Sequence, residues 1–275
     1  MTRRLAIVGV GMMGEALARG LLASGWSPAD IVVTDAVAAR ADDVAKSLGC
    51  AKASDAKAAA AEASGVLLAV KPQDARGALT ELAGALGSSG LVSIVAGMQT
   101  LVIEEVLGPE ASVVRAMPNT PARVGKGVTA LSSGNNTSDA TRELADAVFS
   151  AVGPVVWLDE SKLDAVTALS GSGPAYVFLV AEALVDAGVA LGLPRDVAET
   201  LTYATLEGSA KMLRQTGEVP AVLRAQVTSP GGTTAAALAV LESRAVRAAF
   251  HEALEAARDR SVELGSTAQR SEAAK

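Results

Sequence analysis

The chain has 275 residues, of which 50% are apolar and only 3% aromatic, so it can bury a large aliphatic core. At roughly 150 residues per domain, this length favours two domains. The 24 basic and 30 acidic residues give a net charge of −6 without any basic run, which argues against a nucleic-acid partner. The single cysteine and single histidine exclude an internal disulfide and a Cys- or His-rich metal cage. We expect no metal site and a cytoplasmic location.

Membrane insertion is not expected either. The glycines that interrupt the N-terminal apolar run argue against a signal peptide. The most apolar stretch, 175–185, contains Glu182 and is followed by Asp186, so it falls short of the roughly 18 apolar residues of a membrane span.

A glycine-rich turn follows the first predicted strand, 5–8. This strand is apolar throughout, as expected when both faces are covered, and the turn leads into a helical pattern. The first glycine allows a tight turn, the second lets the backbone approach a pyrophosphate, and the third permits close helix–strand contact. The predicted dinucleotide contacts are Gly9, Val10, Gly11, Met12, Met13 and Gly14.

The second predicted strand, 31–35, ends in Thr34 and Asp35, which we also expect at the cofactor. A carboxylate here would accept hydrogen bonds from the ribose 2′-OH of NAD and repel the 2′-phosphate of NADP. Arg40 could instead pair with that phosphate, or lie on a solvated helix face. The residues alone leave the choice between NAD and NADP open.

Strands and helices alternate as far as about residue 160, which predicts a Rossmann-like, doubly wound parallel sheet. Open α/β sheets bind ligands at the carboxyl ends of their strands. Two strand ends therefore carry further candidate cofactor contacts, namely Ala69, Val70, Lys71 and Pro72, and Ala96 and Gly97. For Lys71 an exposed loop cation is the alternative.

Two prolines in the segment Met117–Ala122 predict an extended, non-helical stretch. Within it, Asn119 is a candidate cofactor contact, with a rigid turn as the alternative reading.

From residue 161 the pattern is helical, so we predict domains at 1–160 and 161–275. The Ser-Gly-Ser-Gly run at 170–173 predicts a break between two helices. The second of these helices is apolar on nearly all sides, and its enclosure calls for a second subunit, hence a dimer. Glu182 and Asp186 are expected to form ion pairs or face the subunit boundary.

The turn Ser-Pro-Gly-Gly-Thr-Thr at 229–234 opens another helix. Its glycines leave room for a ligand, and the free N–H groups of the first helical turn suit an anion. The hydroxyls can bind a substrate or simply cap the helix. A last helix is expected over 243–264, followed by a frayed tail.

Several motifs together resemble the pyrroline-5-carboxylate reductase family. They are GVGMMGEAL at 9–17, AVKP at 69–72, AG at 96–97, RAMPNTPA at 115–122, LSGSGPAY at 169–176 and PAVLRAQVTSPGGTTAAALAVLE at 220–242. The last of these is the most specific. The resemblance implies a Rossmann domain followed by an all-α dimerisation domain, dimers that often assemble into decamers, and reduction of 1-pyrroline-5-carboxylate to L-proline by NAD(P)H.

The resemblance also implies roles for the 229–234 turn. Thr234 is placed on the imine nitrogen as the catalytic residue, while Ser229 and the N–H groups around Gly231, Gly232 and Thr233 hold the substrate carboxylate. NADP(H) is the expected cofactor, and Asp35 keeps NAD(H) as the alternative. A cyclic imine is basic enough to be protonated near neutral pH, so no strong general acid is required.

Two other classes of protein fit parts of the sequence. A β-hydroxyacid or other imine dehydrogenase would use a lysine of the helical domain, but Lys162 and Lys211 lie in no motif of that kind. A non-catalytic dinucleotide-binding regulator would have no need of a second anion site at 229–234.

Overall fold

A computed structural model of the chain describes residues 4–61 and 63–273, with side chains up to Gly265. The chain forms two compact units. We call them the sheet unit, Met1–Ser172 with Ala257–Lys275, and the helical unit, Gly173–Ala256. Each is described by itself, and the domain boundary at residue 160 stays a prediction.

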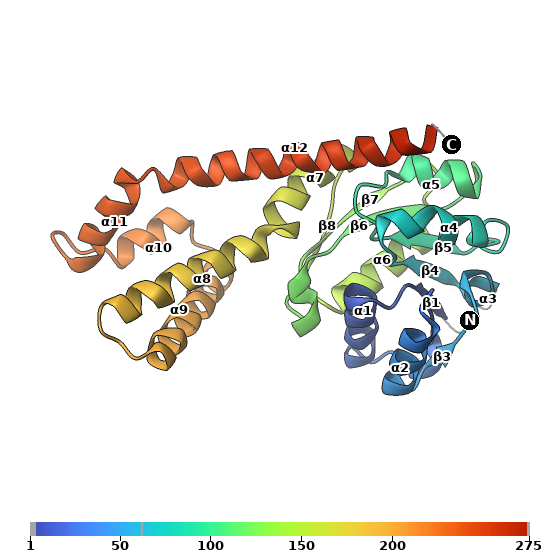
Figure 1. Cartoon of the computed structure of the whole chain (residues 1–275), viewed down its shortest axis with the longest axis horizontal. Helices are drawn as coiled ribbons and strands as arrows, with labels where there is room; N and C mark the ends of the chain where they lie inside the picture. Colours follow the sequence, from blue (N-terminus) through green and yellow to red (C-terminus); the bar gives the residue numbers. More distant parts are fainter. Residues whose placement is uncertain (1–3, 62, 274–275) are drawn as a thin grey trace. The chain divides into compact units, whose positions relative to one another are not determined.

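Within the described residues, one eight-stranded sheet has the order β3-β2-β1-β4-β5-β6-β7-β8 (Figure 1). The strands are β1 (Leu5–Val8), β2 (Ile31–Thr34), β3 (Ala51–Lys52), β4 (Gly65–Leu68), β5 (Gly90–Ser93), β6 (Val113–Met117), β7 (Thr129–Ser133) and β8 (Val155–Trp157). The Rossmann-like α/β sheet is confirmed, with one difference: β7 runs antiparallel to β6. A parallel neighbour would need a long crossover, whereas only a short helical turn separates β6 from β7.

Helices cover both faces of the sheet (Figure 1). Leu5 and Ile7 of β1 enter the core formed with α1, α2 and α6, whereas Ala6 and Val8 enter the core formed with α3, α4 and α5. This two-sided cover explains why the strands are apolar throughout. The helices of this unit are α1 (Met12–Ala23), α2 (Ala38–Leu48), α3 (Ala56–Ala61), α4 (Pro72–Leu82), α5 (Thr100–Leu107), α6 (Asp139–Ser150) and α7 (Leu163–Val166), with 3-10 helices η1 (Pro28–Asp30), η2 (Thr120–Val124) and η3 (Glu160–Lys162).

The prediction that Met117–Ala122 is extended and non-helical holds as far as Asn119 and is wrong from Thr120, where η2 (Thr120–Val124) begins. Pro121 lies in the first turn of η2, where its missing N–H leaves no helical hydrogen bond unmade and its fixed φ suits the helix.

The predicted Ser-Gly-Ser-Gly break between two helices takes the form of a π-helix and a bend at Ser172 rather than a loop. After α7 the chain continues as a π-helix, η4 (Thr167–Gly171), and α8 starts at Gly173. The N–H of Ser172 donates to the carbonyl of Thr167 at 2.8 Å, the i to i−5 bond of a π-helix. A Cβ at Gly171 would lie 2.6 Å from Cε of Met117, so glycine here lets η4 approach the end of β6.

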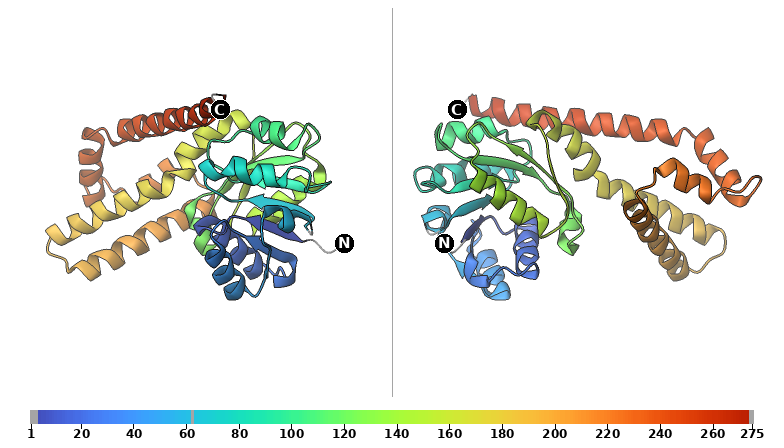
Figure 2. Two further views of the ribbon diagram at one scale, coloured as in Figure 1. Left: turned by 45° about the vertical axis from the view of Figure 1, so that its right-hand side comes forward. Right: turned by 180° about the vertical axis from the view of Figure 1, so that it is seen from behind.

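The helical unit contains α8 (Gly173–Ala190), α9 (Arg195–Thr216), α10 (Pro220–Gln226), α11 (Thr233–Ser243) and the first part of α12 (Val246–Ala273). Helices α8 and α9 lie side by side (Figure 2). The helix predicted from residue 243 starts later, because Ala245, with φ 54°, separates α11 from α12. The predicted frayed tail is wrong as far as Ala273, where α12 ends, and its last two residues lie outside the described part of the chain.

The expectation that no stretch is apolar enough to span a membrane is corrected by the helical stretch Glu160–Ala190. By length and composition it is sufficient, and only 11% of its most apolar window is buried within the chain. Of α8 itself, only Ala181 and Val185 are buried. A single copy of the chain therefore does not enclose this helix.

Candidate active site

The glycine turn lies at the carboxyl edge of the sheet. Val8, the last residue of β1, pairs with Thr34 on β2 and also with the last residue of β4. The N–H of Gly9 donates to the carbonyl of Thr34 at 2.8 Å, and the N–H of Ala69 donates to the carbonyl of Val8 at 2.8 Å. The structure therefore brings together the cofactor contacts predicted after β1, β2 and β4, with Asp35 next to Thr34.

The three glycines of the turn meet different surroundings. Gly9 has φ +93°, and a Cβ on it would lie 2.7 Å from the carbonyl oxygen of Ala69. A Cβ on Gly14 would overlap the carbonyl oxygen of Gly9. A Cβ on Gly11 would meet no atom within 4 Å, and no side chain caps α1 at this residue. An open, uncapped helix start of this kind fits a pyrophosphate, so the chain can accommodate a dinucleotide here.

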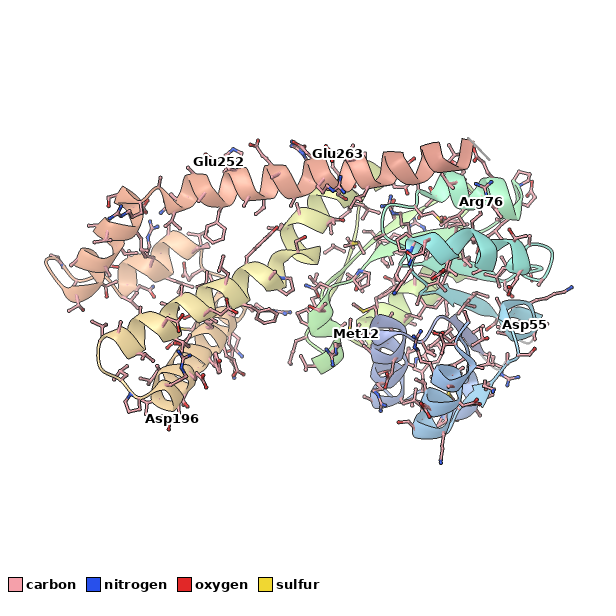
Figure 3. The ribbon with its side chains drawn as sticks, in the orientation of Figure 1. Met12, Asp55, Arg76, Asp196, Glu252 and Glu263 are labelled. Atoms are coloured by element: carbon pink, nitrogen blue, oxygen red, sulfur yellow. The ribbon has the colours of Figure 1, made fainter. Side chains whose placement is uncertain are left out.

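The remaining residues of the turn divide between core and surface. Val10 is buried, and Met13 packs against the same core. Met12, labelled in Figure 3, lies in the first turn of α1. It is 77% exposed. Val10 and Met13 therefore anchor the turn, and a ligand would meet backbone groups and Met12.

Asp35 is held by several protein groups. Its carboxylate accepts hydrogen bonds from the N–H of Val10 at 2.9 Å and from the N–H of Val37 at 2.9 Å. Nη1 of Arg40 lies 3.0 and 3.2 Å from the two carboxylate oxygens. The side chain of Asp35 is only 6% exposed, whereas that of Arg40 is 49% exposed. Asp35 thus ties the glycine turn to the start of α2.

The predicted contacts after β4 and β5 also lie at the carboxyl edge. Ala69 and Val70 are half-buried, and the exposed Lys71 is the N-cap residue of α4, with Pro72 in the first turn. Ala96 is exposed, and Gly97 has φ +74°. A Cβ on Gly97 would lie 3.3 Å from Cα of Gly265, so the loop after β5 contacts α12, which the sequence did not predict.

Asn119 is 8% exposed and makes hydrogen bonds within the sheet unit. Its Oδ1 accepts from the N–H of Val128 at 2.9 Å, and its Nδ2 donates to the carbonyl of Ser170 in η4 at 3.1 Å. The side-chain amide is therefore a structural link, and its predicted contact with the cofactor stays a prediction.

A buried polar cluster near the same edge was missed by the sequence analysis. Oε1 of Glu160 accepts from the N–H of Thr100 at 2.9 Å and from Nη1 of Arg115 at 3.0 Å, while its Oε2 accepts from the Thr100 hydroxyl at 2.7 Å. Arg115 is 8% exposed. The available signal was an arginine in the apolar strand VVRAM, because a buried guanidinium requires a partner.

The turn at 229–234 stands at the start of α11. The N-cap residue is Gly232, and no side chain caps the helix. The N–H of Gly232 donates to the carbonyl of Ser229 at 3.0 Å, and Gly231 has φ +67°. In the described part of the chain, the hydroxyls of Ser229, Thr233 and Thr234 make no protein hydrogen bond. Capping therefore does not engage these hydroxyls, and they are available to a ligand.

The helical unit also has a groove of about 710 Å³ along α8 and α9, lined by both apolar and charged residues. Phe178, which is 61% exposed, lines it together with Val177 and Glu182. Asp186 lies 3.1 Å from Nη2 of Arg195, so the predicted ion pairing of Asp186 is confirmed. An exposed apolar surface of this kind marks an interaction site.

Comparisons with known proteins place the chain in a family. The family described as NADP oxidoreductase coenzyme F420-dependent matches residues 4–97, and the family described as pyrroline-5-carboxylate reductase dimerisation matches residues 160–264. A pyrroline-5-carboxylate reductase of Corynebacterium melassecola is 43% identical over 265 residues, which cover 95% of this chain and 98% of the relative. The chain belongs to the pyrroline-5-carboxylate reductase family.

Solved structures of the family agree with this assignment. The chain superimposes on a pyrroline-5-carboxylate reductase from Coxiella burnetii with a TM-score of 0.91 and 39% identity, covering 96% of this chain and 99% of that one. A Plasmodium falciparum pyrroline carboxylate reductase, solved with NADP bound, gives a TM-score of 0.84 and 30% identity, covering 96% and 98%.

The resemblance read from the motifs is thus confirmed, and neither the β-hydroxyacid dehydrogenase nor the regulator is favoured. The dimerisation match also supports oligomerisation.

Proposed function

We propose that this protein reduces 1-pyrroline-5-carboxylate to L-proline with a hydride from NADPH, as the last step of proline biosynthesis. The observation that carries the proposal is the uncapped start of α11, where hydroxyls without protein partners stand beside free N–H groups. The same chain has an open glycine turn at the carboxyl edge of its sheet and belongs to the pyrroline-5-carboxylate reductase family.

The chemistry assigned to this turn is orientation rather than acid catalysis. The Thr234 hydroxyl accepts a hydrogen bond from the protonated imine nitrogen, which keeps the imine carbon aimed at the reductant. Ser229 and the N–H groups around Gly231, Gly232 and Thr233 hold the substrate carboxylate, because an uncapped helix start attracts an anion. A protonated cyclic imine is electrophilic enough to accept hydride without a strong general acid.

When bound, the dinucleotide supplies the hydride through its nicotinamide ring. The residues proposed to hold it are Gly9, Val10, Gly11, Met12, Met13, Gly14, Thr34, Asp35, Ala69, Val70, Lys71, Pro72, Ala96, Gly97 and Asn119. NADP(H) is the proposed cofactor, supported by the Plasmodium falciparum relative with NADP bound and by the half-exposed Arg40 beside Asp35. NAD(H) is the alternative.

We further propose a homodimer whose subunits pack along α8 and α9, with dimers assembling into a decamer. The exposed apolar side chains of α8 and the dimerisation match support the dimer. The partner subunit, rather than lipid, then covers Glu160–Ala190. The dimerisation match begins at residue 160, which supports a domain boundary there. A cytoplasmic enzyme without membrane or nucleic-acid partners fits the biosynthetic reaction and the net charge of −6.

The reaction is tested with NADPH that carries deuterium at C4 of the nicotinamide. The purified protein is incubated with pyrroline-5-carboxylate, and the product is analysed by mass spectrometry and NMR. We expect L-proline with one deuterium on the ring carbon that was the imine carbon. Oxidation of NADPH by a β-hydroxyacid-derived ketone but not by the imine would support the dehydrogenase instead. Binding of NADPH without turnover on any of these compounds would support the regulator.

A further inference from the structure

Asp35 occupies the position from which an acidic residue reads the ribose in NAD-dependent Rossmann folds, yet its carboxylate is already engaged by the protein. It accepts hydrogen bonds from the N–H groups of Val10 and Val37, both at 2.9 Å, one on each oxygen. Arg40 binds both oxygens through Nη1 at 3.0 and 3.2 Å. To bind a ribose hydroxyl, this carboxylate would have to give up bonds that shape the cofactor site.

The bond to Val10 connects Asp35 directly with the glycine turn. Val10 lies between Gly9 and Gly11, and its side chain is buried in the core. Because the Asp35 side chain is 6% exposed, its charge-assisted hydrogen bond to Val10 is shielded from competing water. Asp35 therefore fixes the backbone on which a pyrophosphate would rest.

Arg40 has the opposite character. Its side chain is 49% exposed, and it touches Asp35 only through Nη1. Among the residues whose side chains the structure describes, Nε and Nη2 of Arg40 donate to no protein atom. A guanidinium anchored at one nitrogen, with its two other nitrogens free in the same plane, is suited to bind a phosphate. The charge of Asp35, in turn, is offset by the arginine that it holds.

We propose that Asp35 is a positioning residue that braces the glycine turn and aims Arg40, and that Arg40 binds the 2′-phosphate of NADP(H). The proposal rests on the proposed function, which makes a nicotinamide dinucleotide the reductant. The acidic residue after β2 thereby supports the phosphorylated cofactor instead of rejecting it.

The test measures equilibrium binding of NADP⁺ and NAD⁺ by calorimetry on the full-length protein, without pyrroline-5-carboxylate. The variants are Arg40→Ala, Asp35→Asn and, as a control, Lys46→Ala, which removes one positive charge from the last turn of the same helix. Arg40→Ala is expected to weaken NADP⁺ binding about tenfold or more, because it removes hydrogen bonds to a charged group, and to change NAD⁺ binding less than about twofold. Lys46→Ala should leave both affinities within about twofold of the unaltered protein.

Asp35→Asn separates the two roles of the carboxylate. The amide cannot accept from both Val10 and Val37, so we expect weaker binding of both nucleotides, with no rise in the ratio of NADP⁺ to NAD⁺ affinity. A residue that reads the ribose would give the reverse, a gain of about tenfold in that ratio, and this result would overturn the proposal. So would unchanged NADP⁺ binding by Arg40→Ala.

A second readout needs no nucleotide. Hydrogen exchange of the backbone N–H groups at 9–14 should become faster in Asp35→Asn and stay unchanged in Lys46→Ala. Equal exchange rates in both variants would contradict the role of Asp35 in holding the glycine turn. If Asp35→Asn does not fold, Asp35→Ser is measured in the same way. Because no substrate is present, a protein that shows these effects but does not reduce pyrroline-5-carboxylate contradicts only the proposed function. If the unaltered protein reduces pyrroline-5-carboxylate but Arg40→Ala binds NADP⁺ as tightly as the unaltered protein does, only this inference is contradicted.

Discussion

The side-chain amide of Asn119 joins the end of β6 to the π-helix η4, because its Nδ2 donates to the carbonyl of Ser170 at 3.1 Å. Its Oδ1 accepts from the N–H of Val128 at 2.9 Å, so both ends of the amide are engaged. π-helical turns occur frequently at functional sites, and this one is fixed by a buried side chain at the carboxyl edge of the sheet.

Asn119→Asp tests whether this link matters for turnover. Aspartate keeps an acceptor for Val128 but cannot donate to Ser170, and it places a negative charge beside a carbonyl. We expect a loss of about 1–3 kcal/mol in the free energy of unfolding and a lower kcat. Asn136→Asp, on an exposed loop of the same unit, is the control. Unchanged stability would contradict the structural link, and a raised KM for NADPH would support the proposed contact of Asn119 with the cofactor.

Gly11 and Gly14 are expected to respond differently to the same substitution. A Cβ at Gly14 overlaps the carbonyl of Gly9, so Gly14→Ala should destabilise the apo-protein by about 2–4 °C or more in Tm. A Cβ at Gly11 enters open space, so Gly11→Ala should leave Tm nearly unchanged and weaken NADP⁺ binding about tenfold. Calorimetry and thermal unfolding check both variants. Unimpaired nucleotide binding by Gly11→Ala would place the pyrophosphate elsewhere.

Glu160 should stabilise the sheet unit through Arg115. Glu160→Ala leaves a nearly buried guanidinium without its carboxylate, so we expect the free energy of unfolding to fall by about 3 kcal/mol. The control is Glu15→Ala, which removes the partner of Arg19 in an exposed ion pair. Its free energy of unfolding should change by less than about 1 kcal/mol. Urea unfolding at pH 7 compares the two. Equal losses would show that the Glu160 cluster contributes no more than a surface pair.

Cys50 should react slowly with alkylating reagents. Partial burial raises the pKa of its thiol, so the reactive thiolate is scarcer at pH 8 than for an ordinary cysteine. Since Cys50 is the only cysteine, mass spectrometry after iodoacetamide treatment follows it alone. At pH 8 the alkylation rate of Cys50 in the folded protein should be below that in the urea-unfolded chain. The difference between the two rates should become smaller as the pH rises. Equal rates at pH 8 would contradict the burial.

Much of the sheet unit could be predicted because its signals are local. The apolar runs of β1 and β4 and the glycines at 9–14 report two-sided burial and a tight turn within a few residues. The bonds of Asp35 to Val10 and of Asn119 to Ser170 link residues far apart in sequence, and no spacing rule reveals them. The Ser-Gly-Ser-Gly run indicated a break but not its form, because the π-helical bond from Ser172 to Thr167 leaves no recognisable spacing in the sequence.

In the helical unit, the sequence and the structure both indicate that α8 needs more cover than a single chain provides. The apolar circumference of α8 predicts enclosure, and the single chain leaves most of it exposed. The turn at 229–234 was recognised from its glycines and hydroxyls, but only the structure shows that no side chain caps α11. The sequence could identify the groups that bind a substrate, whereas their freedom from other partners is a property of the folded unit.

The initial rate of NADPH oxidation with pyrroline-5-carboxylate, compared between the unaltered protein, Thr234→Ser and Thr234→Ala, tests the central claim most directly. We expect Thr234→Ser, which keeps the hydroxyl, to retain most of the turnover. Thr234→Ala should lose about tenfold to a hundredfold in kcat, with unchanged Tm and NADPH affinity, because it removes a hydrogen bond to a charged nitrogen. Equal rates for all three proteins, or no oxidation of NADPH by the unaltered protein, would contradict the account.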